Sequence, residues 1–209
     1  ILGCKNSVIP SDGSVVTIGD YAFSGSKIAE IVIPDTVTTI NNRAFYYCTE
    51  LMKITLGRNL SSINNNYLRE SFDGCYRLVE IYNCSQLNIQ AQKTDNGYIS
   101  RYALNVYTPT SGQSLLEKTN EGFVFCGNSL VAYIGQETNL VLPETYNEKS
   151  YKINGYAFYG NNNLVSVRMP DTITAIGSYA FGNCINLEQI NISSNVTKIQ
   201  VSAFINCKK

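Results

Sequence analysis

The 209-residue chain contains no histidine and no tryptophan. Without histidine the chain can have no Ser-His-Asp or Cys-His nucleophile and no histidine-ligated zinc. It also lacks the side chain that most often acts as a general base. The motifs C-x-x-C, G-x-x-x-x-G-K and D-x-D-x-D-G are also missing, which argues against zinc-ribbon, phosphate-loop and calcium-loop sites. The sequence therefore predicts no catalytic residue, no cofactor and no metal, and we expect a protein that is not an enzyme.

Charge is sparse and balanced, with 16 basic against 16 acidic residues and 15% charged residues in all. Because no basic run is present to neutralise phosphates, we expect no nucleic-acid binding. No apolar run reaches membrane-spanning length and no charged-then-apolar leader opens the chain, so we expect no membrane insertion by these residues. The first residue falls inside a motif, and we expect the chain to begin within a longer protein.

One cassette recurs along the chain. The stretch Ile176–Ile199 reads I-G-S-Y-A-F-G-N-C-I-N-L-E-Q-I-N-I-S-S-N-V-T-K-I, and its end residues lie 199 − 176 = 23 positions apart. Related cassettes open at Ile18, Ile40, Ile153 and Ile199, and a version with a longer corner opens at Ile63. A fixed period in the twenties indicates a solenoid.

Each cassette holds two short strand patterns, L-x-x-I-x-I/L as in Leu51–Leu56 and V-x-x-I as in Val37–Ile40. The intervening Y-A-F-x-x-C segment is short, so we expect one helical turn or an irregular turn. Parallel strands linked this way should coil right-handed, and neighbouring coils should stack to close a common core. The phenylalanines that recur in register are predicted to stack as a buried spine: Phe23, Phe45, Phe72, Phe158, Phe181 and Phe204.

Four of the seven cysteines follow these phenylalanines by three positions: Cys48, Cys75, Cys184 and Cys207. Adjacent coils lie about 4.8 Å apart, a separation that does not by itself forbid a disulfide. Stacked equivalents point their Cβ atoms in parallel, however, so free buried thiols are the favoured interpretation. The redox state of the cysteines stays open, and they do not indicate a compartment.

The period fails after residue 86. Within the next segment, Tyr98–Tyr107 has the apolar spacing of a short amphipathic helix, while Gly122–Phe125 and Leu130–Ile134 flank Cys-Gly-Asn-Ser as in a β-hairpin. The sequence thus predicts a repeat block over 1–86, a helix-plus-hairpin insert over 87–138 and a second repeat block over 139–209. We expect all three to belong to one continuous solenoid domain.

The cassette I-G-x-x-A-F-x-x-C-x-x-L-x-x-I-x-I-P resembles the BspA-like, Treponema pallidum-type leucine-rich repeat family. The segments N-G-Y-I-S-R-Y-A and E-G-F-V-F are similar to a module that interrupts such proteins in gut bacteria. The resemblance implies a β-rich α/β leucine-rich-repeat solenoid in an exported, cell-surface or secreted protein of a gut or commensal bacterium. It also implies similarity to adhesins that bind host matrix proteins.

In leucine-rich solenoids the exposed positions of the L-x-x-I-x-I strands line one surface. This surface is the candidate site for a protein partner, with host extracellular-matrix or cell-surface proteins as the class that the resemblance suggests. A merely solvated strand face is the alternative, and the insert is a second candidate surface. The strand-face positions are Glu30, Val32, Lys53, Thr55, Glu80, Tyr82, Ser166, Arg168, Gln189 and Asn191.

Tyrosines also gather around the A-F turns, and they are read either as a sugar-stacking platform or, preferably, as surface packing: Tyr21, Tyr46, Tyr47, Tyr156, Tyr159 and Tyr179. The most concrete function that the sequence supports is a non-catalytic protein-binding or adhesion module that presents an extended strand face. A structural spacer that displays other domains and has no ligand of its own is the alternative. The partner, the anchoring and the oligomeric state are not predicted.

Overall fold

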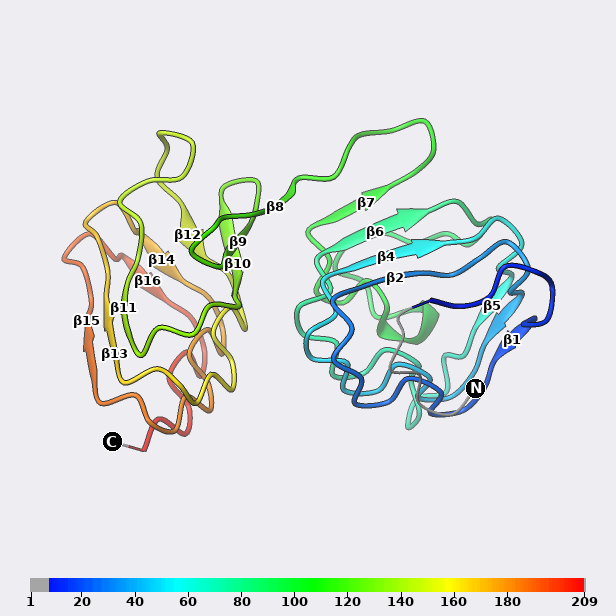
Figure 1. Ribbon diagram of the computed structural model, residues 1–209, viewed down its shortest axis with the longest axis horizontal. Helices are drawn as coiled ribbons and strands as arrows, with labels where there is room; N and C mark the ends of the chain where they lie inside the picture. The colour runs from blue at the N-terminus through cyan, green and yellow to red at the C-terminus, as the bar shows by residue number, and fades with distance from the viewer. Residues whose placement is uncertain (1–7, 209) are drawn as a thin grey trace. The chain divides into compact units, whose positions relative to one another are not determined.

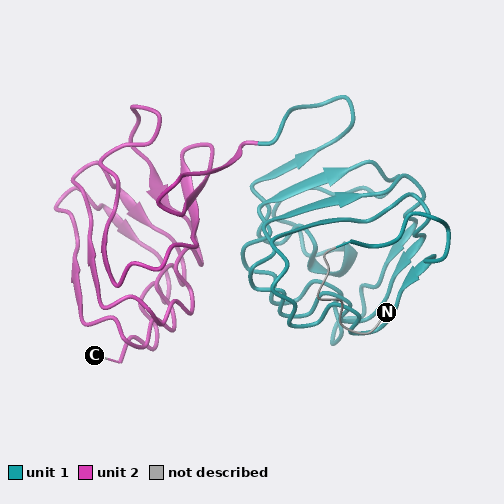
Figure 2. Cartoon of the chain, viewed as in Figure 1, with its two compact units in different colours: residues 1–114 teal, residues 115–209 magenta. Residues whose placement is uncertain are grey.

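The computed structural model describes residues 8–208, which form two compact units, residues 1–114 and 115–209 (Figures 1 and 2). The described part of unit 1, residues 8–114, holds seven strands and one short 3-10 turn: β1 (Thr17–Ile18), β2 (Glu30–Val32), β3 (Thr39–Ile40), β4 (Lys53–Leu56), β5 (Ser62–Ile63), β6 (Glu80–Asn83), η1 (Asn96–Tyr98) and β7 (Asn105–Tyr107). Unit 2 holds nine strands: β8 (Leu116–Lys118), β9 (Phe123–Cys126), β10 (Ser129–Tyr133), β11 (Asn139–Val141), β12 (Lys152–Ile153), β13 (Ser166–Arg168), β14 (Ala175–Ile176), β15 (Gln189–Asn191) and β16 (Lys198–Ile199).

Unit 1 is a parallel-strand solenoid with two sheets. One sheet has the order β2-β4-β6-β7 and the other β1-β3-β5, and every pairing within them is parallel. The register follows the repeat, since Ile31 lies beside Ile54 and Ile54 beside Ile81. Equivalent residues of successive coils therefore sit side by side, as the cassette predicts.

Unit 2 repeats this construction. Strands β11, β13 and β15 form one parallel sheet, while β10, β12, β14 and β16 are parallel in the other. The second sheet is extended by an antiparallel β8-β9-β10 element, in which Cys126 pairs with Ser129 across a two-residue turn. The hairpin expected around Cys-Gly-Asn-Ser is thus confirmed.

The repeat phenylalanines form a stacked ladder inside each unit. Ring centroids of Phe23 and Phe45 lie 4.9 Å apart, and those of Phe158 and Phe181 lie 4.6 Å apart, with interplanar angles of 4° and 3°. These separations match the spacing of adjacent strands, about 4.8 Å, because each coil contributes one ring at the same position. Phe45, Phe158 and Phe181 are completely buried. The predicted spine is confirmed as one ladder per unit, although Phe204 at the end of the second ladder is only half-buried.

The A-F turns are irregular rather than helical, and they depend on left-handed backbone. The residue before each Ala-Phe has a positive φ in most coils, for example 57° at Tyr21 and 56° at Tyr179. The second residue after the phenylalanine is also left-handed, which explains Gly25 and Gly74 at that position. A Cβ at Gly74 would also lie only 2.7 Å from the Tyr47 ring.

Buried thiols reinforce the stacking. Cys48 donates its S–H to the Phe23 carbonyl at 3.0 Å, and Cys184 donates to the Phe158 carbonyl at 3.1 Å. Each bond links a coil to the preceding one, so a small side chain with a weak donor fits this position. Six cysteines are free thiols, while Cys4 lies outside the described residues. Burial raises the pKa of Cys75 well above the usual thiol range.

The expected helix over Tyr98–Tyr107 is wrong. The chain instead makes the short turn η1 and then strand β7, which pairs in parallel with β6. The apolar residues that suggested a helical face serve the solenoid, since Ile99 and Ala103 enter the core of unit 1. The Leu104 N–H donates to the Val79 carbonyl at 2.8 Å, so bonding to the preceding coil prevails over a local helix.

The coil pattern consequently extends into the segment assigned to the insert. The Phe72 N–H donates to the Gly97 carbonyl at 2.8 Å, as the Phe23 N–H does to Ala44 at 2.7 Å. Residues up to β7 therefore complete one more coil of unit 1. Each sheet lies within one unit. A single continuous solenoid domain with a right-handed coil stays a prediction.

Candidate functional site: the strand faces

The sheet β2-β4-β6-β7 presents two rows of side chains, which together we call the unit-1 face. Residues that pair directly across parallel strands lie side by side, about 4.8 Å apart. The charged row consists of Glu30, Lys53, Glu80 and Asn105. The apolar row consists of Val8, Val32, Thr55, Tyr82 and Tyr107.

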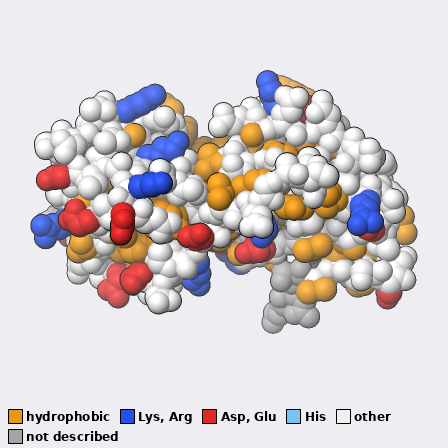
Figure 3. Space-filling model, turned by 90° about the horizontal axis from the view of Figure 1, so that it is seen from above, with side chains coloured by type: hydrophobic (Ala, Val, Ile, Leu, Met, Phe, Trp, Pro, Cys, Tyr) orange, Lys and Arg blue, Asp and Glu red, His pale blue; other side chains and the backbone are white. Residues whose placement is uncertain are grey.

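The apolar row is exposed at one end and aromatic at the other. Val8 and Val32 are 73% and 60% exposed, and the Tyr82 and Tyr107 rings lie 6.2 Å apart. Hydrophobic side chains also gather on the side of unit 1 seen in Figure 3. A groove of about 420 Å³ runs along this end, lined by Val8, Ile9, Ser11, Glu30, Ile31, Val32, Pro34, Lys53 and Thr55.

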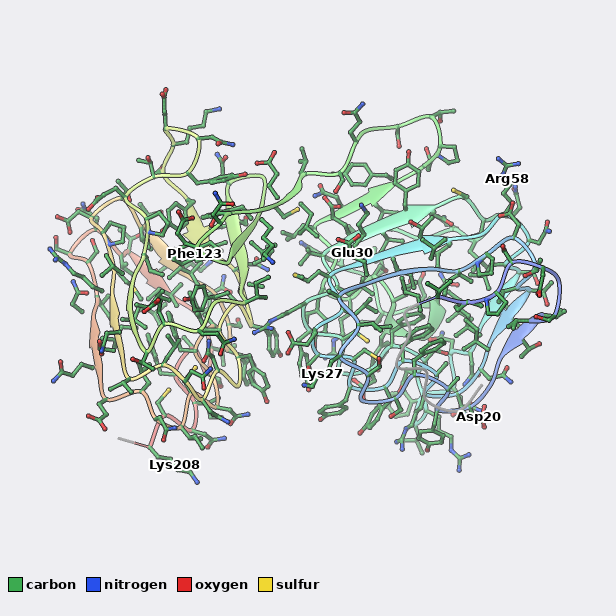
Figure 4. The ribbon with its side chains drawn as sticks, viewed as in Figure 1. Asp20, Lys27, Glu30, Arg58, Phe123 and Lys208 are labelled. Carbon is green, nitrogen blue, oxygen red and sulfur yellow. The ribbon has the colours of Figure 1, made fainter. Side chains whose placement is uncertain are left out.

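The charged row is close to neutral. Lys53 Nζ lies 4.0 Å from Glu30 Oε2, and Glu30, labelled in Figure 4, is largely exposed. A surface pair of this kind contributes little to stability. Glu80, expected among the exposed positions, is only 1% exposed. It accepts a 2.6 Å hydrogen bond from Ser114 Oγ, so the chain after β7 reaches this carboxylate.

The sheet β11-β13-β15 presents the equivalent rows in unit 2, the unit-2 face. One row holds Asn139, Ser166 and Gln189; the other holds Val141, Arg168 and Asn191. A second groove of about 360 Å³ is lined by Val141, Leu142, Glu144, Arg168, Met169, Pro170, Asp171 and Asn191. The second of these rows has one valine, Val141, beside the polar Arg168 and Asn191, whereas the apolar row of unit 1 has two valines and two tyrosines.

Hydrogen bonds order part of the unit-2 face. Ser166 Oγ donates to Asn139 Oδ1 at 2.8 Å, and Asn191 Oδ1 accepts from the Met169 N–H at 2.8 Å. Arg168 is exposed and makes no ion pair among residues 8–208. Its guanidinium is therefore available to a carboxylate or an aromatic ring of another molecule.

The structure places the ten expected residues on the strands of these two faces, six in unit 1 and four in unit 2. Sequence reasoning missed further members of the same rows: Val8, Asn105, Tyr107, Asn139 and Val141. The position of Val141 could have been predicted from the sequence, because Leu140-Val-Leu-Pro143 repeats the strand-and-proline pattern of Ile31-Val-Ile-Pro34. Tyr107 was hidden by the helical interpretation of its segment.

The turn tyrosines contact one another rather than forming an open platform. Tyr156 and Tyr179 stack at 5.1 Å, and the Tyr46 and Tyr47 rings lie 4.6 Å apart. Arg43 lies 4.7 Å from the Tyr46 ring and donates to the Tyr21 hydroxyl at 3.2 Å, a hydrogen bond that raises the pKa of Arg43. These contacts support surface packing over sugar stacking.

Among residues 8–208, no cluster of three or more Cys, Asp or Glu side chains is placed to hold a metal ion. No helix there has the length and apolar content needed to span a membrane.

The chain matches the family model described as "BspA type Leucine rich repeat region", in 6 copies, over residues 3–104 and 131–209. The match includes residues 87–104, in agreement with the additional coil that ends at β7. Comparison with curated proteins found no match.

Solved structures with similarity include a leucine rich cell surface protein from Faecalibacterium prausnitzii, 22% identical over 92% of this chain and 69% of that one, with a TM-score of 0.39. The pneumococcal vaccine antigen PcpA is 19% identical over 87% of this chain and 44% of that one, with a TM-score of 0.42. The Treponema pallidum leucine rich repeat protein is 21% identical over 88% of this chain and 78% of that one, with a TM-score of 0.31. The chain thus spans less than half the length of the pneumococcal antigen.

Proposed function

This chain belongs to the BspA-type leucine-rich repeat family, and from that membership we propose that it is a non-catalytic protein-binding module of a bacterial cell-surface or secreted protein. Solenoids of stacked repeats offer extended surfaces suited to protein partners. In this proposal the module acts by presenting a rigid strand face, and the partner is a protein, with host extracellular-matrix and cell-surface proteins as the first class to test.

The unit-1 face carries the proposal. Its apolar row holds two exposed valines at one end and two tyrosines at the other, with Thr55 between them, and a groove lies at the valine end. Aromatic side chains supply much of the energy of protein interfaces, and exposed valines that lie together lose water on binding. A face used only as a spacer has no need for this arrangement. Tyr82 and Val32 are therefore the central contacts of the proposed interface.

The experiment is a binding measurement with immobilised matrix proteins, such as fibronectin and collagen, as probes. Tyr82→Ala and Val32→Glu should each weaken binding at least tenfold, equivalent to about 1.4 kcal/mol. The matched control is Val16→Glu, because Val16 is 50% exposed and precedes β1 of the other sheet of unit 1. The control should bind like the unchanged chain.

Unit 2 provides a second arm of the same experiment. Arg168→Glu reverses a charge on the unit-2 face, and Lys152→Glu makes the same change on β12 of the other sheet. A loss confined to Arg168→Glu would move the interface to unit 2. If the unchanged chain binds no matrix or cell-surface protein, the adhesion proposal fails and the spacer alternative takes its place.

A further inference from the structure

Strand β11 has an open edge that the fold of unit 2 itself produces. The sheet that contains β12 continues through β10, β9 and β8, whereas the sheet β11-β13-β15 has no strand beyond β11 among residues 8–208 (Figure 1). Residues 134–138 run directly from β10 to β11 and add no strand there. Because β10 and β12 belong to the same unit, this edge is internal to the chain.

The backbone of this edge has unpaired donors and acceptors. On the other side of β11, the Leu142 N–H donates to the Arg168 carbonyl of β13 at 2.9 Å. A strand in a parallel sheet directs the backbone groups of alternate residues to opposite sides, so Asn139 and Val141 point away from β13. Their backbone N–H and C=O groups have no partner in residues 8–208. Such an edge is a template for another strand.

Unit 1 shows what fits an edge of this kind. Val32 in β2 corresponds to Val141 in β11, since each lies in the first strand of its sheet and in the equivalent row. On its outer side Val32 pairs in parallel with Val8, and the next residue, Ile9, is buried. The occupant there is extended backbone that runs parallel to the strand. The equivalent place beside β11 is open.

Both flanks of β11 are held in place. Before the strand, the Glu137 N–H donates to the Tyr133 hydroxyl at 3.2 Å. After it, the Tyr151 hydroxyl donates to the Pro143 carbonyl at 2.7 Å. Both tyrosines are buried. A backbone that is fixed in the binding conformation loses little freedom when another strand pairs with it, which favours binding.

Charge around the edge indicates the chemistry of the occupant. Residues 119–148 contain four glutamates and no lysine, arginine or aspartate. Glu137 precedes β11 and Glu144 follows it, and both are exposed. In the adjoining groove the carboxylates of Glu144 and Asp171 outnumber the guanidinium of Arg168. A segment that carries lysine or arginine complements this edge.

We propose that β11 binds an extended, basic segment of a partner protein by strand addition, with the segment parallel to β11. The backbone groups of Asn139 and Val141 pair with the backbone of the segment. One of its side chains lies beside Val141 at the groove of the unit-2 face, and its lysine or arginine side chains contact Glu137 and Glu144. This site is separate from the unit-1 face, so its test is independent of the interface proposed there.

NMR titration of the isotope-labelled full chain tests the proposal, because it detects weak binding at a named backbone amide. The probe is the acetylated and amidated peptide Lys-Val-Thr-Val-Thr-Lys. It should shift the amide signals of Asn139 and Val141 and slow their hydrogen exchange. Two control peptides carry N-methyl groups on one or the other set of alternate residues. Since only one side of the peptide faces β11, one control should bind about tenfold or more weakly and the other like the probe.

Variants of the chain assign the binding to this edge. Val141→Pro removes an outward N–H and keeps the Leu142 bond to β13, so it should weaken peptide binding by about tenfold or more. Val141→Thr keeps the N–H and is the matched control, which should bind like the unchanged chain. Glu137→Lys with Glu144→Lys should also weaken binding. Tyr82→Ala, on the unit-1 face, should have no effect on the peptide.

Three results would overturn the proposal. In the first, the Val141 amide of the free chain exchanges as slowly as paired amides do, which means that the edge is already covered. In the second, the peptide leaves the signals of Asn139 and Val141 unchanged at millimolar concentration. In the third, both N-methylated peptides, or a peptide with glutamate in place of lysine, bind as well as the probe. The peptide comparisons use the unchanged chain, so they decide the matter even if Val141→Pro fails to fold.

Discussion

The two units have interiors of the same construction but different surfaces. Both stack phenylalanine rings in register, and both carry thiols that donate to the carbonyl of the preceding ring. At the outward position where unit 1 has Val32 and Tyr82, unit 2 has Val141, Arg168 and Asn191. Inward positions must fit a neighbour of the same shape, whereas outward positions other than Glu80, which contacts Ser114, are open to solvent or a partner. Recognition is therefore expected to reside in the outward positions.

Removing a central ring of a ladder should have the largest effect on stability, and the loss should be confined to the unit that contains the ring. Phe45→Ala deletes a fully buried ring between Phe23 and Phe72, and it should lower the free energy of unfolding of unit 1 by about 3–5 kcal/mol. Phe204→Ala, at the half-buried end of the other ladder, should cost clearly less. Denaturant unfolding, combined with hydrogen exchange measured separately for each unit, gives both losses. Equal losses would contradict the claim that a central ring of the ladder stabilises its unit more than the end ring does.

A matched glycine pair sharpens the comparison. Gly19 and Gly177 both follow the first isoleucine of a cassette. A Cβ at Gly177 would lie 2.3 Å from the backbone nitrogen of Gly155, whereas a Cβ at Gly19 would meet no atom of residues 8–208 within 4 Å. Gly177→Ala should therefore destabilise unit 2 by about 1–3 kcal/mol.

Gly19→Ala is the control for that pair. It should be neutral or should stabilise unit 1 by about 0.4–1 kcal/mol, because alanine restricts the unfolded chain. Thermal unfolding of both variants measures the difference. A destabilising Gly19→Ala would show that the first coil is packed more tightly than the structure indicates.

Alkaline pH should lower the stability of unit 2 more than that of unit 1, and this effect should be smaller than those above. Burial, followed by the hydrogen bond to Glu117, raises the pKa of Tyr146 to about 12, and burial raises the pKa of Tyr151 as well. An unfolded tyrosine ionises near about pH 10. The folded unit 2 holds these protons to higher pH, so its stability is complete below about pH 10 and falls as the pH rises towards about 12.

Tyr151→Phe tests this assignment. The Tyr151 hydroxyl donates to the Pro143 carbonyl at 2.7 Å, so its loss should cost about 1 kcal/mol at neutral pH. The variant should also lose less stability between pH 9 and 12 than the unchanged chain. Unfolding of unit 2 followed against pH measures both quantities, and an unchanged alkaline slope would rule out Tyr151 as the titrating group.

The solenoid was predictable because its cause is local and repeated. A phenylalanine, a cysteine and alternating isoleucines recur at a constant spacing, and stacking equal coils is the arrangement that buries all of them together. The positions of Val32, Lys53, Thr55 and Tyr82 on one face followed from the same period. Tyr107 was missed because the segment before it departs from the cassette. The apolar residues of that turn and strand have a spacing that resembles the spacing of an amphipathic helix.

The sequence by itself determined which side chains lie inside each coil and which neighbours they meet, because a constant period places like residues over like. Only the tertiary structure decided that residues 98–107 finish a coil rather than form a helix, since that choice rests on hydrogen bonds to Val79 and pairing with β6. The burial of Glu80 was likewise settled by a contact with Ser114, 34 residues away. Contacts between segments of unlike sequence carry no periodic signal, and their outcome depends on where the chain returns in space.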